Sequence, residues 1–118
     1  PEPAGHYAQG VVRGSTLYVS GQLPVEPGTG KKITDGIDVQ MRRVLDNVLA
    51  VVEAAGGSLN SIVKTTVYVS DISAWGEVDA VYAAFFGDHT PARAVVPTKE
   101  LHFGFQVEME AIAALDES

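Results

Sequence analysis

Cysteine is absent from the 118-residue sequence. Without a thiol the chain can form no disulfide, cysteine nucleophile, zinc–thiolate site or iron–sulfur cluster. The absence fits a reducing cytoplasm, and that is where we expect the protein. The three histidines, His6, His89 and His102, show no metal-ligand spacing, and no glycine-rich phosphate loop follows a predicted strand. We therefore expect neither a metal nor another cofactor.

A long apolar run is also missing. The most apolar stretch, residues 44–55, is interrupted by two carboxylates and an amide. It is far shorter than the roughly 20 apolar residues that cross a bilayer. Residues 1–3 carry neither the basic nor the apolar region of a signal peptide. The sequence therefore predicts no membrane association, and its length predicts one domain over residues 1–118.

Basic residues are few. Eight lysines and arginines stand against 15 aspartates and glutamates, giving a formal charge of −7 and a sequence pI near 4.7. Proteins that bind nucleic acids use clustered basic residues to displace counterions from phosphates. We therefore expect no nucleic-acid partner. A small anionic substrate would need one well-placed cation instead of a general positive field.

The chain does contain an alternation of short strands with two helices. Residues 7–22 resemble a hairpin that turns at Arg13-Gly14-Ser15. Three more strands are predicted at 62–69, 92–96 and 105–115, and helices precede the first two of them. This order predicts an α+β fold in which both helices cover one face of the sheet.

The first helix is indicated by apolar residues that recur at spacings of three and four. They are Ile37, Met41, Val44, Leu45, Val48, Val52 and Ala55. Thr34, Asp35 or Asp38 is expected to cap its start, and Gly56-Gly57 to end it.

The second helix is expected to begin at a Ser73 cap and to end at Gly87. Its apolar face is predicted to consist of Trp75, Val78, Tyr82, Phe85 and Phe86.

The two faces of the predicted sheet differ in composition. The more apolar set, expected to lie under the helices, comprises Val63, Thr65, Val67, Val69, Val107, Met109, Ala111 and Ala113. The other face combines Ile62, Tyr68 and Ile112 with Glu108. Because this mixture is too polar for a core and too apolar for water, we expect it to contact other subunits around a polar pocket. A solvated face with scattered apolar residues is the alternative.

A specific motif occupies the last third of the chain. Pro91-Ala92-Arg93-Ala94 precedes alternating apolar residues, and Val107-Glu108-Met109 follows the next turn. Related segments elsewhere are Gly5-His6-Tyr7-Ala8-Gln9-Gly10, Ser20-Gly21-Gln22-Leu23-Pro24, Asp46-Asn47, Val63 to Val69 and Tyr82 to Phe86. Through these residues the chain resembles the Rid family of reactive intermediate deaminases, also called the YjgF-like or RidA family, over about residues 5–113.

The resemblance implies a chorismate-mutase-like α+β fold. Three subunits would pack their sheets into a central barrel, with the helices outside and three pockets between subunits. It also implies hydrolysis of 2-imino and 2-enamino acids, such as 2-iminopropanoate and 2-iminobutanoate, to 2-keto acids and ammonia. Pyridoxal-phosphate dehydratases that act on serine or threonine release these compounds.

Three residues match catalytic residues of the family. Arg93 matches the arginine that binds the substrate carboxylate, for which a planar guanidinium offers two parallel hydrogen bonds. Glu108 matches the glutamate that positions water and passes a proton to nitrogen, without metal or covalent nucleophile. Tyr7 matches a pocket tyrosine. Alternatively, Arg93 is a surface ion-pair residue, Glu108 a solvated strand residue like Glu110, and Tyr7 a half-buried strand aromatic.

Other positions match substrate contacts or depart from the family. Ser20 and Gly21 match a pair that contacts the bound acid, Gly21 through its backbone; ordinary turn residues are the alternative. Val95 stands where many relatives have cysteine, so only its backbone amide could contact a carboxylate. Asp79 replaces an asparagine of the second helix and is expected to add negative charge near the pocket.

The turn at 99–105 also departs from the family, and its Leu101, His102 and Phe103 are expected to reshape the pocket mouth. Two other functions compete with deamination. A non-catalytic module for small carboxylates would keep Arg93 and the trimer without turnover. Family members have also been described as endoribonucleases or translation inhibitors, a role that the charge of −7 opposes.

Overall fold

The computed structural model describes residues 1–3 and 5–115. Five strands and two helices follow the predicted order, with short 3₁₀ turns between them. The elements are β1 (Gly10–Arg13), β2 (Thr16–Gln22), α1 (Ile37–Ala54), η1 (Leu59–Ser61), β3 (Ile62–Val69), η2 (Ile72–Ala74), α2 (Trp75–Phe86), β4 (Ala92–Pro97), η3 (His102–Gly104) and β5 (Val107–Ala114).

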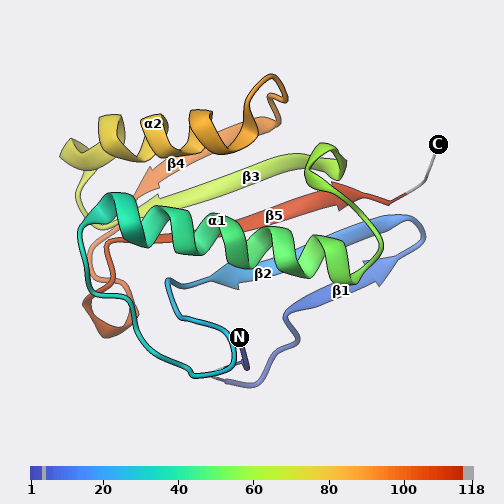
Figure 1. Ribbon diagram of the computed structural model, residues 1–118, viewed down its shortest axis with the longest axis horizontal. Coiled ribbons are helices and arrows are strands. Elements are labelled where there is room, and N and C mark those ends of the chain that lie inside the picture. The colour runs from blue at the N-terminus through green and yellow to red at the C-terminus, as the bar shows by residue number, and fades with distance from the viewer. Residues whose placement is uncertain (4, 116–118) are drawn as a thin grey trace.

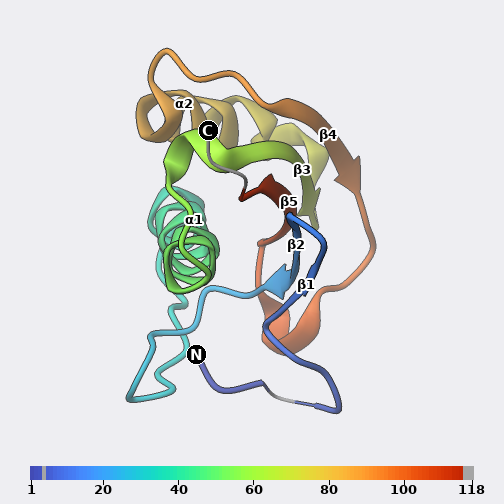
Figure 2. The ribbon, with the colours of Figure 1, turned by 90° about the vertical axis from the view of Figure 1, so that its right-hand side faces the viewer.

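The five strands form one mixed sheet in the order β1-β2-β5-β3-β4. Every neighbouring pair is antiparallel except β3 and β4, which are parallel and joined through α2. Both helices lie on the same side of this sheet (Figures 1 and 2). The predicted α+β fold with two helices on one sheet face is therefore confirmed.

The core lies between α1 and the sheet. The predicted apolar stripe of α1 is buried, with Met41, Val44 and Leu45 fully inaccessible. Val67 on β3 and Met109 on β5 are equally inaccessible on the facing side of the sheet. Burying an aliphatic side chain of this size is worth roughly 1.5–3 kcal/mol. This packing holds the helices on one face of the sheet. The strand side chains that point to the other face are not part of this core.

The helix starts differ from those predicted. Gly36 is the N-cap of α1 and makes no side-chain cap, whereas Gln40 donates from Nε2 to the carbonyl of Asp35, 2.8 Å away. Asp71, not Ser73, accepts the capping bond, from the backbone N–H of Ser73 at 3.0 Å. The bond that Asp71 accepts thus caps the 3₁₀ turn η2, which precedes α2.

The helix ends agree with the prediction. Gly56 follows α1 with φ +93°, and Gly87 follows α2 with φ +62°. Residues with a Cβ rarely adopt such left-handed backbone angles, so glycine ends both helices cleanly.

The first residues of β3 contradict the predicted alternation. Ile62 is fully buried, whereas Val63 is 46% exposed. The pairing of β3 with β5 shifts between Ile62 and Lys64, which reverses the side on which these residues lie. From Thr65 onward the expected alternation holds. Trp75, assigned to the apolar face of α2, is likewise 43% exposed.

The second face of the sheet has no helix over it among the described residues. Side chains of directly paired residues share a face, so Tyr68, Glu108 and Val96 point together to this open side. Ile112 and Tyr18 form another such pair, and Tyr18 is 50% exposed. The predicted mixture of apolar residues and Glu108 is thus present on this face, whereas Ile62 belongs to the core.

Candidate functional site

Four of the predicted site residues lie together in one cavity. This cavity has a volume of about 400 Å³. Its lining consists of Gly5, Tyr7, Ser20, Gly21, Leu23, His102, Phe103 and Glu108. The segment before β1, the end of β2, the η3 turn and the start of β5 therefore meet at one place. We call it the Glu108 cavity.

Glu108 lies directly against the backbone of Gly21. A Cβ atom built on Gly21 would be 2.1 Å from Oε2 of Glu108, closer than any real contact. The pairing of β2 with β5 explains this approach, because β2 has one residue more than β5 between the pairs Val19–Ala111 and Gln22–Met109. The extra residue makes a bulge at this point of β2. Glycine is thus required here for the close approach of Glu108, whereas the contact of Gly21 with a bound acid stays a prediction.

The surroundings of Glu108 favour the protonated form of its carboxyl group. Burial is the main cause that raises its pKa, and the negative charge of Glu110 adds to the rise. The charge of His102 acts in the opposite sense. A carboxyl group whose pKa lies nearer neutrality is better suited to accept and return a proton.

Ser20 connects β2 to the segment that carries Tyr7. Its hydroxyl donates to the carbonyl of Ala8 at 2.6 Å, and its N–H donates to the carbonyl of Gln9 at 2.9 Å. Buried Gln22 reinforces this connection by donating from Nε2 to Oε1 of Gln9 at 2.6 Å. Because the Ser20 proton is used in this way, the hydroxyl can only accept a bond from a ligand.

Arg93 lies elsewhere in the chain. It pairs on β4 with Thr65, whose buried side chain faces the helices, so Arg93 also lies on the helix side. Its Nη1 is 2.8 Å from Oδ1 of Asp79 on α2. The guanidinium carbon is 5.1 Å from the ring centre of Trp75 and 4.7 Å from that of Tyr82. Arg93 is thus an ion-paired cation stacked on aromatic rings.

A second cavity, of about 360 Å³, surrounds this arginine. Asp79, Tyr82 and His89 are among its lining residues. We call it the Arg93 cavity. The negative charge expected at Asp79 is present there, in direct contact with the guanidinium. The structure therefore places Arg93 and Glu108 in different cavities, on opposite faces of the same sheet.

Val95 lines neither cavity. It pairs with Val67 and packs against the buried core. Its side chain therefore stabilises the fold, and only its backbone on the edge strand β4 could contact a ligand.

Two further features concern the Glu108 cavity, and the sequence left only the second, Asn47, without a role. His102 and Phe103 from the 99–105 turn line it, as the unusual turn suggested. Asn47 is fully buried and donates from Nδ2 to the carbonyls of Leu23 and Val25, at 3.0 and 2.8 Å. This amide fixes the chain that follows β2. The sequence feature that could have indicated this role is a polar residue among the apolar residues of α1.

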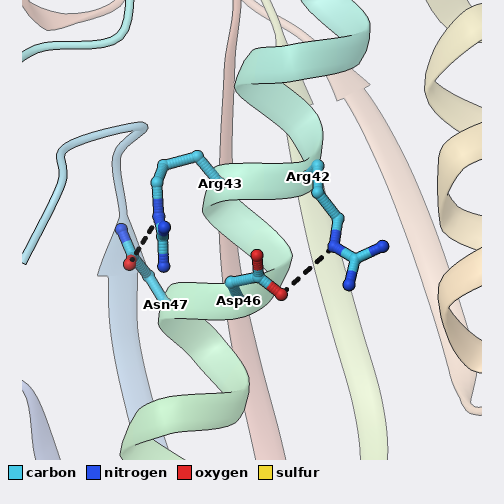
Figure 3. Close-up of polar contacts among 4 residues, drawn as sticks. All are labelled: Arg42, Arg43, Asp46 and Asn47. Atoms are coloured by element: carbon cyan, nitrogen blue, oxygen red, sulfur yellow. Dashed lines mark hydrogen bonds and ion pairs between the residues drawn. The ribbon is translucent and has the colours of Figure 1, made fainter.

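A larger hollow, about 660 Å³, lies at the outer surface of α1 and α2. Both of its arginines interact with neighbours on α1 (Figure 3). Arg42 pairs with Asp46 at 3.2 Å, and Arg43 donates to Oδ1 of Asn47 at 3.1 Å. This hollow is lined by none of the site residues that the sequence predicted. We therefore place the chemistry at the Glu108 cavity in spite of its smaller size.

Within residues 1–3 and 5–115, no group of three His, Asp or Glu side chains is arranged to hold a metal ion. No helix in this part of the chain is long and apolar enough to cross a membrane.

The fold and the site together define a class of protein: two helices on one face of a mixed five-stranded sheet, with a glutamate in a small cavity at the other face. The sequence matches the family model of endoribonuclease L-PSP over residues 1–115. The chain belongs to this family, which is the YjgF-like or RidA family that the motifs indicated.

Relatives in this family bear different names. A RutC family protein of Pyrococcus horikoshii is 42% identical over 113 residues, covering 96% of this chain and 90% of the relative. The 2-iminobutanoate/2-iminopropanoate deaminase of Escherichia coli is 46% identical over 116 residues, with 96% and 90% covered. The structure of E. coli TdcF with bound serine matches with a TM-score of 0.91 at 40% identity, covering 97% of this chain and 91% of that one.

Proposed function

We propose that this protein hydrolyses 2-imino and 2-enamino acids, such as 2-iminopropanoate and 2-iminobutanoate, to 2-keto acids and ammonia. The observation that carries the proposal is the carboxyl group of Glu108, held against Gly21 in a small cavity where burial raises its pKa. The deaminase name of the E. coli relative supports the same activity. The cytoplasmic location remains a prediction.

The positions of Arg93 and Glu108 favour a site shared between subunits. The two side chains lie on opposite faces of one sheet, so one chain cannot place both around a small substrate. In the homotrimer that we propose, the Arg93 cavity of one protomer would adjoin the Glu108 cavity of the next. The exposed side chains of Tyr18 and Val96 on the open face support burial of this face by another copy.

Arg93 would bind the carboxylate of the substrate. Asp79 engages its Nη1, and Trp75 and Tyr82 flank the guanidinium, which restricts its orientation. A restricted guanidinium loses less entropy when it binds a carboxylate. The substrate must nevertheless compete with Asp79 for this cation, which weakens binding.

Glu108 would then promote the addition of water. A carboxylate accepts a proton from the attacking water, and the resulting acid can return it to the departing nitrogen. This pathway uses no metal ion and no covalent intermediate. Tyr7 would form part of the wall around the reacting atoms, since its side chain lines the same cavity.

A non-catalytic module for small carboxylates is the second candidate. The bound serine in TdcF favours it, because serine is a small carboxylate that has been observed with a similar protein. The half-buried position of Glu108 favours catalysis instead, since simple binding of an anion gains nothing from a negatively charged side chain in the same cavity. An endoribonuclease is less favoured because the chain carries a charge of −7.

Ammonia release from freshly generated iminopropanoate and iminobutanoate tests the proposal. The wild type should accelerate release above the spontaneous rate, and Arg93→Ala should abolish most of the acceleration. Light scattering should give about three times the chain mass of 12.5 kDa. Tight binding of small carboxylates without any acceleration would favour the binding module.

A further inference from the structure

His102 shares the cavity of Glu108. It begins the η3 turn, its side chain is exposed, and it lines the cavity together with Tyr7, Ser20 and Phe103. Imidazole both donates and accepts protons near neutral pH. Among the described residues that line this cavity, His102 and Glu108 carry the imidazole and the carboxyl group, the side chains that most often transfer protons in enzymes.

The turn that carries His102 has an unusual backbone. Phe103 is the one described non-glycine residue with positive φ, at 58°. Its ring packs on buried Phe105 with centres 5.8 Å apart, and Nζ of Lys32 lies 4.6 Å from the ring centre. Such strained conformations persist where the surroundings enforce them, and they cluster at functional sites. Here the packing of Phe103 fixes the residue beside His102 at the cavity.

The start of β5 is fixed as well. The N–H of Gln106 donates to Oε1 of buried Gln40 at 2.9 Å, and the same Gln40 bonds to the carbonyl of Asp35. The turn is thus attached to α1 on one side and to β5 on the other. His102 and Glu108 therefore line the same cavity from one segment, which these contacts hold in place.

The charges of these two residues interact. The positive charge of His102 lowers the pKa of Glu108, against the effects of burial and Glu110. Tyr68 on β3 faces Glu108 from the neighbouring strand, and Tyr7 lines the cavity from the segment before β1. Lys32 lies beyond, over the ring of Phe103.

We propose that His102 is a further catalytic residue, which exchanges protons with the substrate nitrogen and oxygen while Glu108 exchanges them with water and nitrogen. This role rests on the proposed deaminase function and adds a second proton carrier to it.

The steps balance for a neutral imine. Water forms a C–O bond to C2, the C=N electron pair moves to nitrogen, Glu108 takes a proton from the water, and imidazolium gives one to nitrogen. The product is a carbinolamine. Glu108 then returns its proton to nitrogen, the C–N bond breaks to release ammonia, and imidazole takes the hydroxyl proton as the C=O bond forms. Both side chains end in their starting states.

The test is the pH profile of kcat/KM for ammonia release, corrected for spontaneous hydrolysis. The wild type should lose activity at low pH as Glu108 is protonated, and again at high pH if an imidazolium donates the proton to nitrogen. His102→Gln should lower the rate about 10²-fold near pH 6, the effect of a positioned acid. It should also abolish the decline at high pH. Its decline at low pH should move upward in pH, because the charge that lowers the pKa of Glu108 is gone.

His6→Gln is the matched control, because His6 is exposed and lines neither the Glu108 nor the Arg93 cavity. It should retain the wild-type profile. A His102→Gln profile with both declines in their wild-type positions would overturn the role of His102, whether or not the rate falls. Absence of ammonia release by the wild type would instead contradict the proposed function, and this role with it.

Discussion

The ionisable side chains of the Glu108 cavity and the Arg93 cavity have different surroundings. Glu108 lies against the Gly21 backbone, where burial raises its pKa. Arg93 is already paired with Asp79 and flanked by two aromatic rings. In the proposed mechanism Glu108 exchanges protons, whereas Arg93 is a permanent cation that must release Asp79 to bind a substrate. The proposal thus assigns chemistry and binding to opposite faces of one sheet.

Replacing Glu108 should have the largest effect on turnover. Glu108→Gln retains the shape of the side chain but removes the base, so kcat should fall by roughly 10²- to 10⁴-fold. The affinity for pyruvate, a 2-keto acid product, should change little because Arg93 is intact. Steady-state ammonia release and calorimetry measure the two quantities. Turnover at the wild-type rate would mean that another group activates the water.

Replacing Arg93 should act mainly on binding. Each charge-assisted hydrogen bond contributes about 1.5–3 kcal/mol, so Arg93→Ala should lower kcat/KM by about 10²-fold or more. Arg93→Lys should recover only part of the loss, because a point charge cannot reproduce the two-pronged geometry. Calorimetry with pyruvate provides the binding readout. Unchanged affinity in Arg93→Ala would exclude this cation as the carboxylate site.

Gly21→Ala should disturb the Glu108 cavity alone. The added methyl group would lie 2.1 Å from the present position of Oε2, so Glu108 must move. A displacement of about 1 Å in a catalytic group can cost up to about 10²-fold in rate. Gly5→Ala is the matched control, since its new Cβ would meet only the Tyr7 ring at 3.8 Å. Equal kcat values for the two variants would show that the position of Glu108 is not critical.

Asp79→Asn should have the smallest effect of these variants, and it should strengthen ligand binding instead of weakening it. Partly exposed ion pairs contribute about 0.2–1 kcal/mol, so releasing Arg93 from competition should tighten pyruvate binding by up to about fivefold. Asp79→Glu, which keeps the charge, should bind as the wild type does. Weaker binding by Asp79→Asn would show that Asp79 positions the guanidinium and does not compete with the ligand.

The fold was predictable because its patterns are periodic. The α1 stripe and the glycines at 56 and 87 determine the helices independently of distant contacts. The bulge at Ile62–Val63 was not predictable, since it depends on pairing with β5, about 50 residues further along the chain. The cap predicted at Ser73 was wrong because the 3₁₀ turn η2, capped by Asp71, precedes α2, which begins at Trp75 without a side-chain cap.

The site was predictable in part. The motifs brought together Tyr7, Ser20, Gly21 and Glu108, which share one cavity. They did not reveal that Arg93 lies on the other side of the sheet, because strand alternation on an edge strand depends on its register with β3. They placed His102 at the pocket mouth but gave it no part in proton transfer, since only the folded turn shows that it shares the cavity of Glu108.

Subunit mixing tests the central claim, a site completed by two protomers, most directly. Arg93→Ala and Glu108→Gln chains, each inactive alone, are coexpressed with different tags and the mixed trimers purified. An intact site needs Glu108 from one chain and Arg93 from its neighbour. Each mixed trimer contains one such site out of three, so the purified mixed trimers should show about a third of the wild-type activity. Mixed trimers as inactive as the two parents would contradict the shared site.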